Sequence, residues 1–174
     1  LDLTKKTARL QKEKMSLGLG GIVKGYAADR ALAVLRGAGV KNCLVYAGGD
    51  ISVSGSKGPL PWVVGIQDPR GPGYFATLAV RDMAIVTSGD YERYFEAGGK
   101  RYHHILDPRT GFPADKLRSV TVVAGQGAFA DGLATGLFVM GRETGMQLVE
   151  KMANVEAIMI DQSNRVHLSS GLKG

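Results

Sequence analysis

The chain has 174 residues, of which 44% are hydrophobic, and it carries a formal net charge of +6 at pH 7. This length and composition support one domain with a sizeable core, or a core with a small appendage. The basic residues are scattered without a long basic run, so we expect an anionic ligand or an acidic partner and no nucleic acid. With one cysteine, Cys43, an intramolecular disulfide is excluded and a zinc cluster is not expected. We also expect no membrane-spanning run and no signal peptide in this sequence.

The first third of the chain alternates glycine-rich loops with short periodic segments. We predict a short strand at residues 7–10, a flexible loop at 18–21 and a helix over 24–35, where alanine and leucine recur at helical spacing. The apolar run at 42–47 predicts a buried strand, with Cys43 as a small core residue. A second strand is expected at 51–54, after a Gly-Gly-Asp break.

The remainder of the chain predicts mostly strands and hairpins. The expected strands are 62–66, 74–81, 83–87 and 119–124; the expected hairpins are 91–97 with 100–106 and 155–160 with 165–168; the expected helices are 128–140 and 144–152. Hairpins with few helices favour an α+β fold, in which mixed or antiparallel sheets are flanked by a few helices. We expect the active site in a cleft between sheet and helices.

The segment Ala130–Leu137 reads as the beginning of a helix with two oxygen-bearing side chains on one face. Asp131 and Thr135 are four residues apart, so their side chains stand one above the other. A carboxylate and a hydroxyl in this arrangement can share one hard cation. Without further context, a capping aspartate and a threonine bonded to its own helix explain the same residues.

The segment from Gly20 to Tyr26 is a glycine-rich loop that leads into a helix with Lys24 at its start. Free backbone N–H groups and a lysine suit a phosphate or pyrophosphate, although Lys24 could also be a surface residue. The loop is neither a Walker A motif nor a dinucleotide fingerprint. Asp29, further along the same helix, is expected to be solvated rather than a buried partner of the site.

Two further short motifs follow apolar strands. Gly48 and Gly49 would let a ligand lie close to the backbone, and Asp50 could accept a hydrogen bond from it, or simply close a turn. The hydroxyls of Thr87 and Ser88 with Gly89 could hold a phosphate, or form a plain turn after the strand.

The segment Tyr102–Gly111 is dense in functional residue types. His103 and His104 point to opposite faces of a strand, so one of them at most is expected to face a site. A histidine there could act as a base at neutral pH, or could stack or cap. Asp107 and Arg109 could form no more than a salt-bridged turn.

Six of these segments occur in the order in which they occur in the ApbE family of FAD:protein FMN transferases, which the chain resembles. The motifs are GGIVKGYAAD at 20–29, GGD at 48–50, WVVGIQDP at 62–69, TSGDYER at 87–93, HILDPRTG at 104–111 and ADGLAT at 130–135. Each motif is common, but six in this order are specific. The resemblance spans roughly residues 19–141.

The resemblance implies a magnesium-dependent enzyme that moves FMN from FAD to a threonine of a target protein, with a phosphodiester bond formed and AMP released. Matched to the family, the metal ligands are Asp131, Thr135 and the backbone carbonyl of Gly21. Lys24 faces the pyrophosphate, and His104 is a candidate for activating the acceptor threonine. The implied catalytic residues are thus His104, Lys24 and Asp131, and the implied FAD-binding residues are Gly20, Gly21, Lys24, Gly48, Gly49, Asp50, Thr87, Ser88 and His104.

The resemblance also sets expectations for the rest of the protein. Residues 1–174 would be an ApbE-like core that lacks the upstream part of the family domain, so a missing segment or a second chain could complete the FAD site. Family acceptors include subunits of membrane-bound redox complexes, which implies a lipid-anchored enzyme in the periplasm or on the outer face of the cytoplasmic membrane. Two alternatives stay open: magnesium-dependent hydrolysis of FAD to FMN and AMP, and a flavin-binding module without turnover.

Overall fold

The fold is built on a six-stranded, fully antiparallel sheet in the order β1-β2-β5-β8-β9-β10. The computed structural model describes residues 1–173. The strands of this sheet are β1 (Cys43–Ala47), β2 (Asp50–Ser54), β5 (Ala84–Gly89), β8 (Leu117–Ala124), β9 (Glu156–Asp161) and β10 (Val166–Leu168). Neighbouring strands β2 and β5 are not consecutive in sequence, so the chain leaves the sheet after β2 and returns to it.

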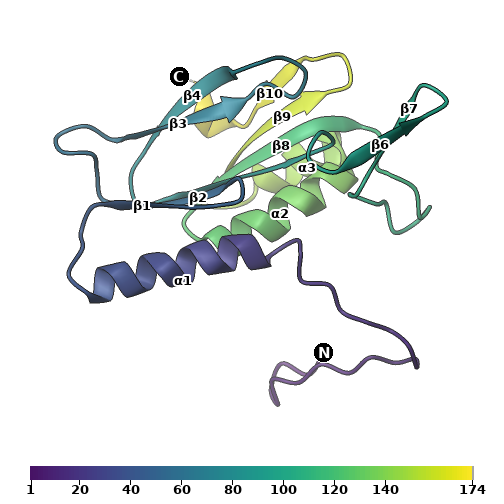
Figure 1. The fold of residues 1–174 in the computed structure, drawn as a ribbon, viewed down its shortest axis with the longest axis horizontal. Helices are drawn as coiled ribbons and strands as arrows, with labels where there is room; N and C mark the ends of the chain where they lie inside the picture. Colours follow the sequence, from purple (N-terminus) through teal and green to yellow (C-terminus); the bar gives the residue numbers. More distant parts are fainter. Residues whose placement is uncertain (174) are drawn as a thin grey trace.

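Three helices cover one face of the sheet (Figure 1): α1 (Val23–Gly37), α2 (Gly127–Met140) and α3 (Arg142–Val149). Helix α1 packs on β1 and β2, and α2 packs on β5 and β8. The contacts of α2 come from Ala130, Ala134, Leu137 and Phe138, which recur at helical spacing and are buried against Val122 and other residues of the sheet. The buried apolar residues form two clusters, one on each face of the sheet, and the larger lies between the sheet and the helices.

The opposite face of the sheet is covered by a two-stranded sheet, β3 (Trp62–Gln67) and β4 (Tyr74–Val80). Val64 and Ile66 of β3 pack with Ile85 and Val123 of the central strands. Strand β8 is therefore buried on both faces, which explains its unbroken run of β-branched residues where an alternating pattern would leave one face in water.

Three parts of the chain lie outside these layers. The hairpin of β6 (Tyr94–Ala97) and β7 (Lys100–His103) projects from one end of the sheet, residues 1–20 lead away from the body, and a short 3-10 turn, η1 (Ser170–Leu172), packs near β9 (Figure 1). In the described part of the chain, no helix combines the length and the hydropathy that a membrane span requires.

The predicted helices and hairpins are confirmed with shifts of a few residues at their ends, and so is the α+β class. The strand predicted at 7–10 is wrong, since the segment forms only one isolated bridge between Asp2 and Thr7. The strand predicted as buried at 42–47 is an edge strand, in which Leu44 and Tyr46 are exposed. Strand β5 continues through Gly89 and does not close at Thr87, because Ser88 and Gly89 stay paired with β8.

Leu137 of α2 is fully buried in the apolar cluster between the helices and the sheet, so truncating it should strongly lower the stability of the fold. Leu137→Ala removes buried apolar surface and leaves a cavity, so we expect a loss of about 3 kcal/mol in the free energy of unfolding. Val34→Ala on the exposed side of α1 is the control and should change stability by less than about 0.5 kcal/mol. Urea unfolding followed by circular dichroism measures both; equal losses would contradict this account of the core.

Candidate active site

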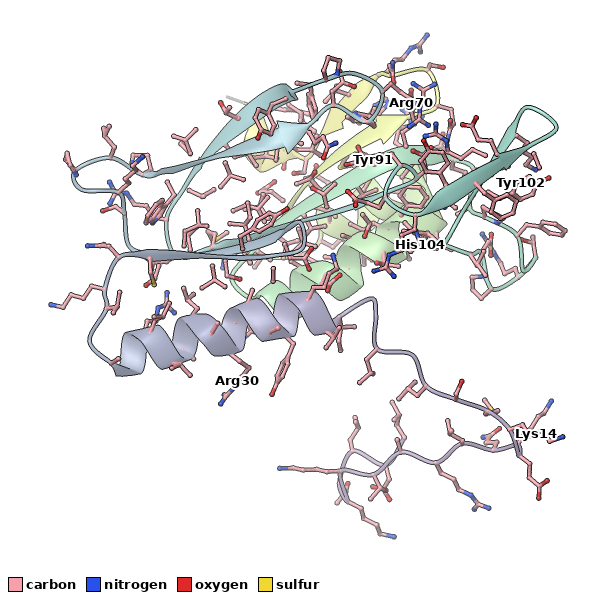
Figure 2. The ribbon with its side chains drawn as sticks, viewed as in Figure 1. Lys14, Arg30, Arg70, Tyr91, Tyr102 and His104 are labelled. Atoms are coloured by element: carbon pink, nitrogen blue, oxygen red, sulfur yellow. The ribbon has the colours of Figure 1, made fainter. Side chains whose placement is uncertain are left out.

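One cleft of about 790 Å³ opens where the start of α1, the end of β5, strands β1, β3 and β4 and the segments flanking the β6–β7 hairpin meet. A volume of this size is within the range of pockets that enclose drug-sized ligands and cofactors. Figure 2 shows His104 at the base of the β6–β7 hairpin, on the same side of the molecule as Tyr91. The predicted site residues that line the cleft are Gly20, Gly21, Lys24, Gly48, Gly49, Thr87, Ser88, His104, Asp131 and Thr135. The cleft was predicted between sheet and helices; both line it, but so do residues of β3 and β4, which cover the sheet face opposite the helices.

The helix α2 brings Asp131 and Thr135 to the floor of the cleft beside the glycine-rich loop. A Cβ atom built on Gly21 would lie 3.8 Å from Thr135 Oγ1, and one built on Gly132 would lie 3.9 Å from the carbonyl oxygen of Gly21. Asp131 is 3% exposed. A carboxylate, a hydroxyl and a backbone carbonyl from two distant segments therefore border one cavity.

Asp131 does not cap its own helix. Its Oδ2 accepts a hydrogen bond of 3.1 Å from the backbone N–H of Gly25, in the first turn of α1. That N–H has no partner within α1, because the first N–H groups of a helix lie ahead of its hydrogen-bonding ladder. The carboxylate thus joins the two helices while its other oxygen is available to the cleft.

Lys24 forms an ion pair with Asp50. Its ammonium lies 2.8 Å from Asp50 Oδ1 and 3.5 Å from the carbonyl oxygen of Gly48, so it is neither a free surface lysine nor an unpaired group of the cleft. Asp50 is fully buried, and its carboxylate does not bond to its own turn as a simple turn aspartate would. Burial, together with the nearby charge of Asp131, raises the pKa of Asp50 to about 6, against the lowering effect of Lys24.

This pairing predicts a measurable change in the Asp50 carboxyl when Lys24 is removed. In Lys24→Met the pKa of Asp50 should rise above its value of about 6, because the hydrogen bond and charge that favour the ionised form are lost. Carbon-13 NMR titration of the side-chain carboxyl in the chain without divalent cations measures it. Lys41→Met, an exposed lysine outside the cleft, should leave the titration unchanged; an unshifted curve in Lys24→Met would refute the pairing.

Strand β5 contributes its two hydroxyls to different faces. Ser88 Oγ lies 3.1 Å from Thr135 Oγ1 on the helix side, whereas Thr87 Oγ1 lies 2.8 Å from Thr121 Oγ1 on the neighbouring strand β8. Alternation along the strand explains the separation. Both residues line the cleft, but Ser88 alone of the two is hydrogen-bonded to an α2 residue of the site.

The turn between β1 and β2 forms another wall of the cleft. Gly48 and Gly49 have φ values of +58° and +103°. Such a conformation strains residues with side chains, and the bare backbone leaves space beside the Lys24 side chain. The turn thus presents main chain to any ligand in the cleft.

Of the two adjacent histidines only His104 lines the cleft, as predicted, but the reason is not alternation along a strand, because β7 ends at His103 and His104 lies in the bend that follows. His103 is buried, with Nε2 2.9 Å from the carbonyl oxygen of Ala114 and Nδ1 accepting from the N–H of Ile105. Burial lowers the pKa of His103. His104 is exposed and lines the cleft, with Nδ1 3.3 Å from the carbonyl oxygen of Arg93. When Nδ1 donates to that carbonyl, Nε2 is the nitrogen able to accept a proton.

Asp107 and Arg109 make only a structural contribution to this region. Arg109 donates three hydrogen bonds from its guanidinium to Asp107, and the turn closes through the carbonyl oxygen of Asp107. The same contacts lower the pKa of Asp107 to about 2. The reading of this pair as a salt-bridged turn is therefore the one that fits.

The cleft also contains residues that the motif analysis did not single out. Tyr91, Tyr46 and Tyr74 line it from the end of β5, from β1 and from β4. The ring of Tyr91 lies over Gly89, where a Cβ would come within 2.4 Å of it, and burial raises the pKa of the phenol to about 12. Asp90, next to Tyr91, is buried and held by the guanidinium of Arg70. The sequence signal that could have identified these cleft residues is an aromatic residue beside a glycine at the end of a strand.

The donor set fits a hard divalent cation better than a transition metal. Across residues 1–173 no group of three or more His, Cys, Asp or Glu side chains could hold a metal ion. The candidate ligands in the cleft are three oxygens of different kinds: the carbonyl of Gly21, the hydroxyl of Thr135 and the carboxylate of Asp131. Oxygen ligands with one or two carboxylates are the preference of Mg²⁺. In addition, within residues 1–173 Asp50 Oδ2 is buried without a hydrogen-bond partner, and Asp131 lies close enough to Asp50 for its charge to raise the pKa of Asp50. This proximity of two carboxylates favours a cation.

The fold and the cleft thus define an α+β protein with an oxygen-lined site suited to a cation and a phosphate-bearing ligand. Comparison with known proteins gives the particular class. The model of the ApbE family matches residues 1–159. The chain is 42% identical over 178 residues to an FAD:protein FMN transferase of Treponema pallidum and 39% identical over 173 residues to one of Klebsiella pneumoniae, covering 95% and 98% of this chain.

A crystal structure of the ApbE protein of Thermotoga maritima superposes with a TM-score of 0.86 at 40% sequence identity, over 91% of this chain and 52% of that protein. This chain belongs to the ApbE family. It spans about half the length of the two curated relatives, 49% and 53%.

Proposed function

We propose that this chain carries the nucleotide-processing site of a magnesium-dependent FAD:protein FMN transferase, which moves FMN from FAD to a threonine hydroxyl of a target protein. The observation that supports the proposal most strongly is the meeting of Gly21, Asp131 and Thr135 at the floor of a cleft that Lys24 also lines. The family relatives named for this activity support the same reaction.

In this proposal Gly21, Asp131 and Thr135 hold Mg²⁺. When bound, the cation supplies charge neutralisation at the bridging phosphates of FAD, a demand shared by phosphoryl-transfer reactions. The chain's residues position the substrate: Lys24 places a positive charge beside the pyrophosphate, while the backbone of Gly48 and Gly49 allows close approach.

The reaction forms one phosphorus–oxygen bond and breaks one. The threonine oxygen of the acceptor attacks the phosphorus of the FMN half, and AMP leaves with the oxygen that had bridged the two phosphates. We assign His104 to accept the threonine proton through Nε2, because its Nδ1 lies beside the Arg93 carbonyl and its ring is exposed in the cleft.

A single assay separates transfer from the two alternatives. The chain is incubated with FAD and Mg²⁺, with and without a threonine-bearing acceptor protein, and AMP and covalently bound flavin are measured. We expect acceptor-dependent AMP release with a fluorescent acceptor. AMP without labelled acceptor would indicate hydrolysis of FAD to FMN, and binding of FAD without either product would indicate a flavin-binding module.

We also propose, from the family resemblance, that the acceptors are subunits of membrane-bound redox complexes and that the protein acts in the periplasm or on the outer face of the cytoplasmic membrane as a lipid-anchored enzyme. The rest of the FAD site would come from a further segment or a second chain. Labelling of candidate acceptor subunits with threonine or alanine at the attachment position tests the first part; flavin on the alanine form would contradict it.

A further inference from the structure

Asp29 lies outside the cleft, yet it holds the helix that carries two of the proposed cation ligands. Its Oδ1 accepts from the backbone N–H of Gly127 at 2.8 Å and from Ser52 Oγ at 3.2 Å, and its Oδ2 accepts from the N–H of Ala128 at 2.9 Å. The expectation that Asp29 is solvated is therefore wrong. Its neighbour Arg30 points away from the body of the protein (Figure 2).

The two helices cap each other through carboxylates. Asp29 of α1 binds the first two N–H groups of α2, and Asp131 of α2 binds the N–H of Gly25 in the first turn of α1. Neither helix has a side-chain hydrogen bond from its own N-cap residue, Ile22 or Gln126. A carboxylate at a helix N-terminus also interacts favourably with the helix dipole.

The helices approach closely enough that their backbones touch at this joint. A Cβ on Gly25 would come within 2.1 Å of the carbonyl oxygen of Gly127, and one on Gly127 within 2.9 Å of Asp29 Oδ1. Glycine at both positions permits the contact, and the paired carboxylates hold it. Short, directional contacts therefore fix the two helix N-termini against each other.

We propose that Asp29 is a positioning residue that sets the distance between the Gly21 carbonyl and the Asp131 and Thr135 side chains, and thereby the affinity of the site for a divalent cation. Gly21 adjoins Ile22, the N-cap residue of α1, and Asp131 lies one helical turn beyond the amides that Asp29 binds. This inference rests on the proposed function, since it takes these three residues as the cation ligands.

Asp29→Asn is the sharpest variant because it changes hydrogen bonding with almost no change in shape. Asparagine keeps one acceptor oxygen, but its amide N–H₂ would face a backbone N–H of α2, donor against donor. The apolar face of α2 is untouched, so the helix is retained while its first turn loses an acceptor. Removing a partner that orients metal ligands reduces metal affinity by about 10–100-fold in other proteins.

The test measures Mn²⁺ binding to the 174-residue chain by electron paramagnetic resonance, without FAD, together with amide hydrogen exchange. We expect Asp29→Asn to weaken Mn²⁺ binding by about 10–100-fold and to speed exchange at the start of α2. The control is Asp82→Asn, another carboxylate that accepts from a backbone N–H, that of Gly55, on the exposed surface. It should bind Mn²⁺ as the parent does.

Three outcomes overturn the inference, and they are distinguishable. If Asp29→Asn binds Mn²⁺ with the affinity of the parent chain while Asp131→Asn loses Mn²⁺ binding, the proposed cation site is supported but Asp29 has no role in it. Weakened binding without faster exchange in α2 also removes it, because the helix would not have moved. If the parent chain itself binds no Mn²⁺, the proposed cation site is wrong and so is this inference, whatever the amide hydrogen exchange shows.

Discussion

Asp131→Asn is expected to reduce magnesium-dependent AMP release from FAD by at least about 100-fold. The substitution removes the one carboxylate among the proposed cation ligands, and charge stabilisation by a bound metal is worth several kcal/mol, where each 1.4 kcal/mol is about a factor of ten in rate. Asparagine retains an oxygen that can accept the Gly25 N–H, so the contact between α1 and α2 can persist.

The measurement is a titration of AMP release against Mg²⁺ concentration for parent and variant. Glu143→Gln is the matched control, since it neutralises an exposed carboxylate of α3 whose ion-pair partner is Arg142. It should leave the titration unchanged. Parental activity in Asp131→Asn, with parental dependence on Mg²⁺, would remove Asp131 from the proposed mechanism.

Gly25→Ala is expected to destabilise the protein as strongly as Leu137→Ala. The new methyl group would lie 2.1 Å from the carbonyl oxygen and 2.4 Å from the carbonyl carbon of Gly127, and these are backbone atoms that cannot rotate away. The helices would have to separate, which would strain the hydrogen bonds of Asp29 and Asp131. We expect a loss of about 3 kcal/mol in the free energy of unfolding and a fall of about 6–12 °C in melting temperature.

Gly37→Ala provides a control of the same chemistry on the same helix. Gly37 is the last residue of α1, and apart from its chain neighbours and its own helix backbone no atom of residues 1–173 lies within 4 Å of the position its Cβ would take. Alanine has the higher helix propensity, so this variant should be neutral or more stable by up to about 1 kcal/mol. Calorimetric unfolding of both variants decides the matter, and similar melting temperatures would show that the helices have room at Gly25.

Most of the secondary structure could be predicted because its signals are local. The periodic alanine and leucine residues of α1, the β-branched run of β8 and the glycine turn between β6 and β7 each lie within a few residues of one another. Strand alternation predicted that His103 and His104 would face different surroundings, which they do, although β7 ends at His103. The error at residues 7–10 shows the limit, since a short apolar pattern forms a strand only where a partner strand is available.

The residues of the candidate site also differ in whether local sequence patterns could predict them. The spacing of Asp131 and Thr135, and the glycines that precede Lys24, can be read from neighbouring residues, so the sequence by itself suggested these groups as candidates for a cation and phosphate site. The partners came from elsewhere in the chain: Asp50 for Lys24, Ser88 for Thr135, and Gly25 for Asp131. No local pattern encodes which distant segments meet.

The sequence by itself thus determined the α+β class and most of the elements, and it named the candidate residues for binding a cation or a phosphate. Only the tertiary structure decided the sheet order, the exposure of β1 at the sheet edge and the role of Asp29 between the helices. The reason is physical: propensity and periodicity act over one or two turns of chain, whereas the contact between Asp29 and Gly127 joins residues 98 positions apart. That contact exists because both helices pack on neighbouring strands of one sheet.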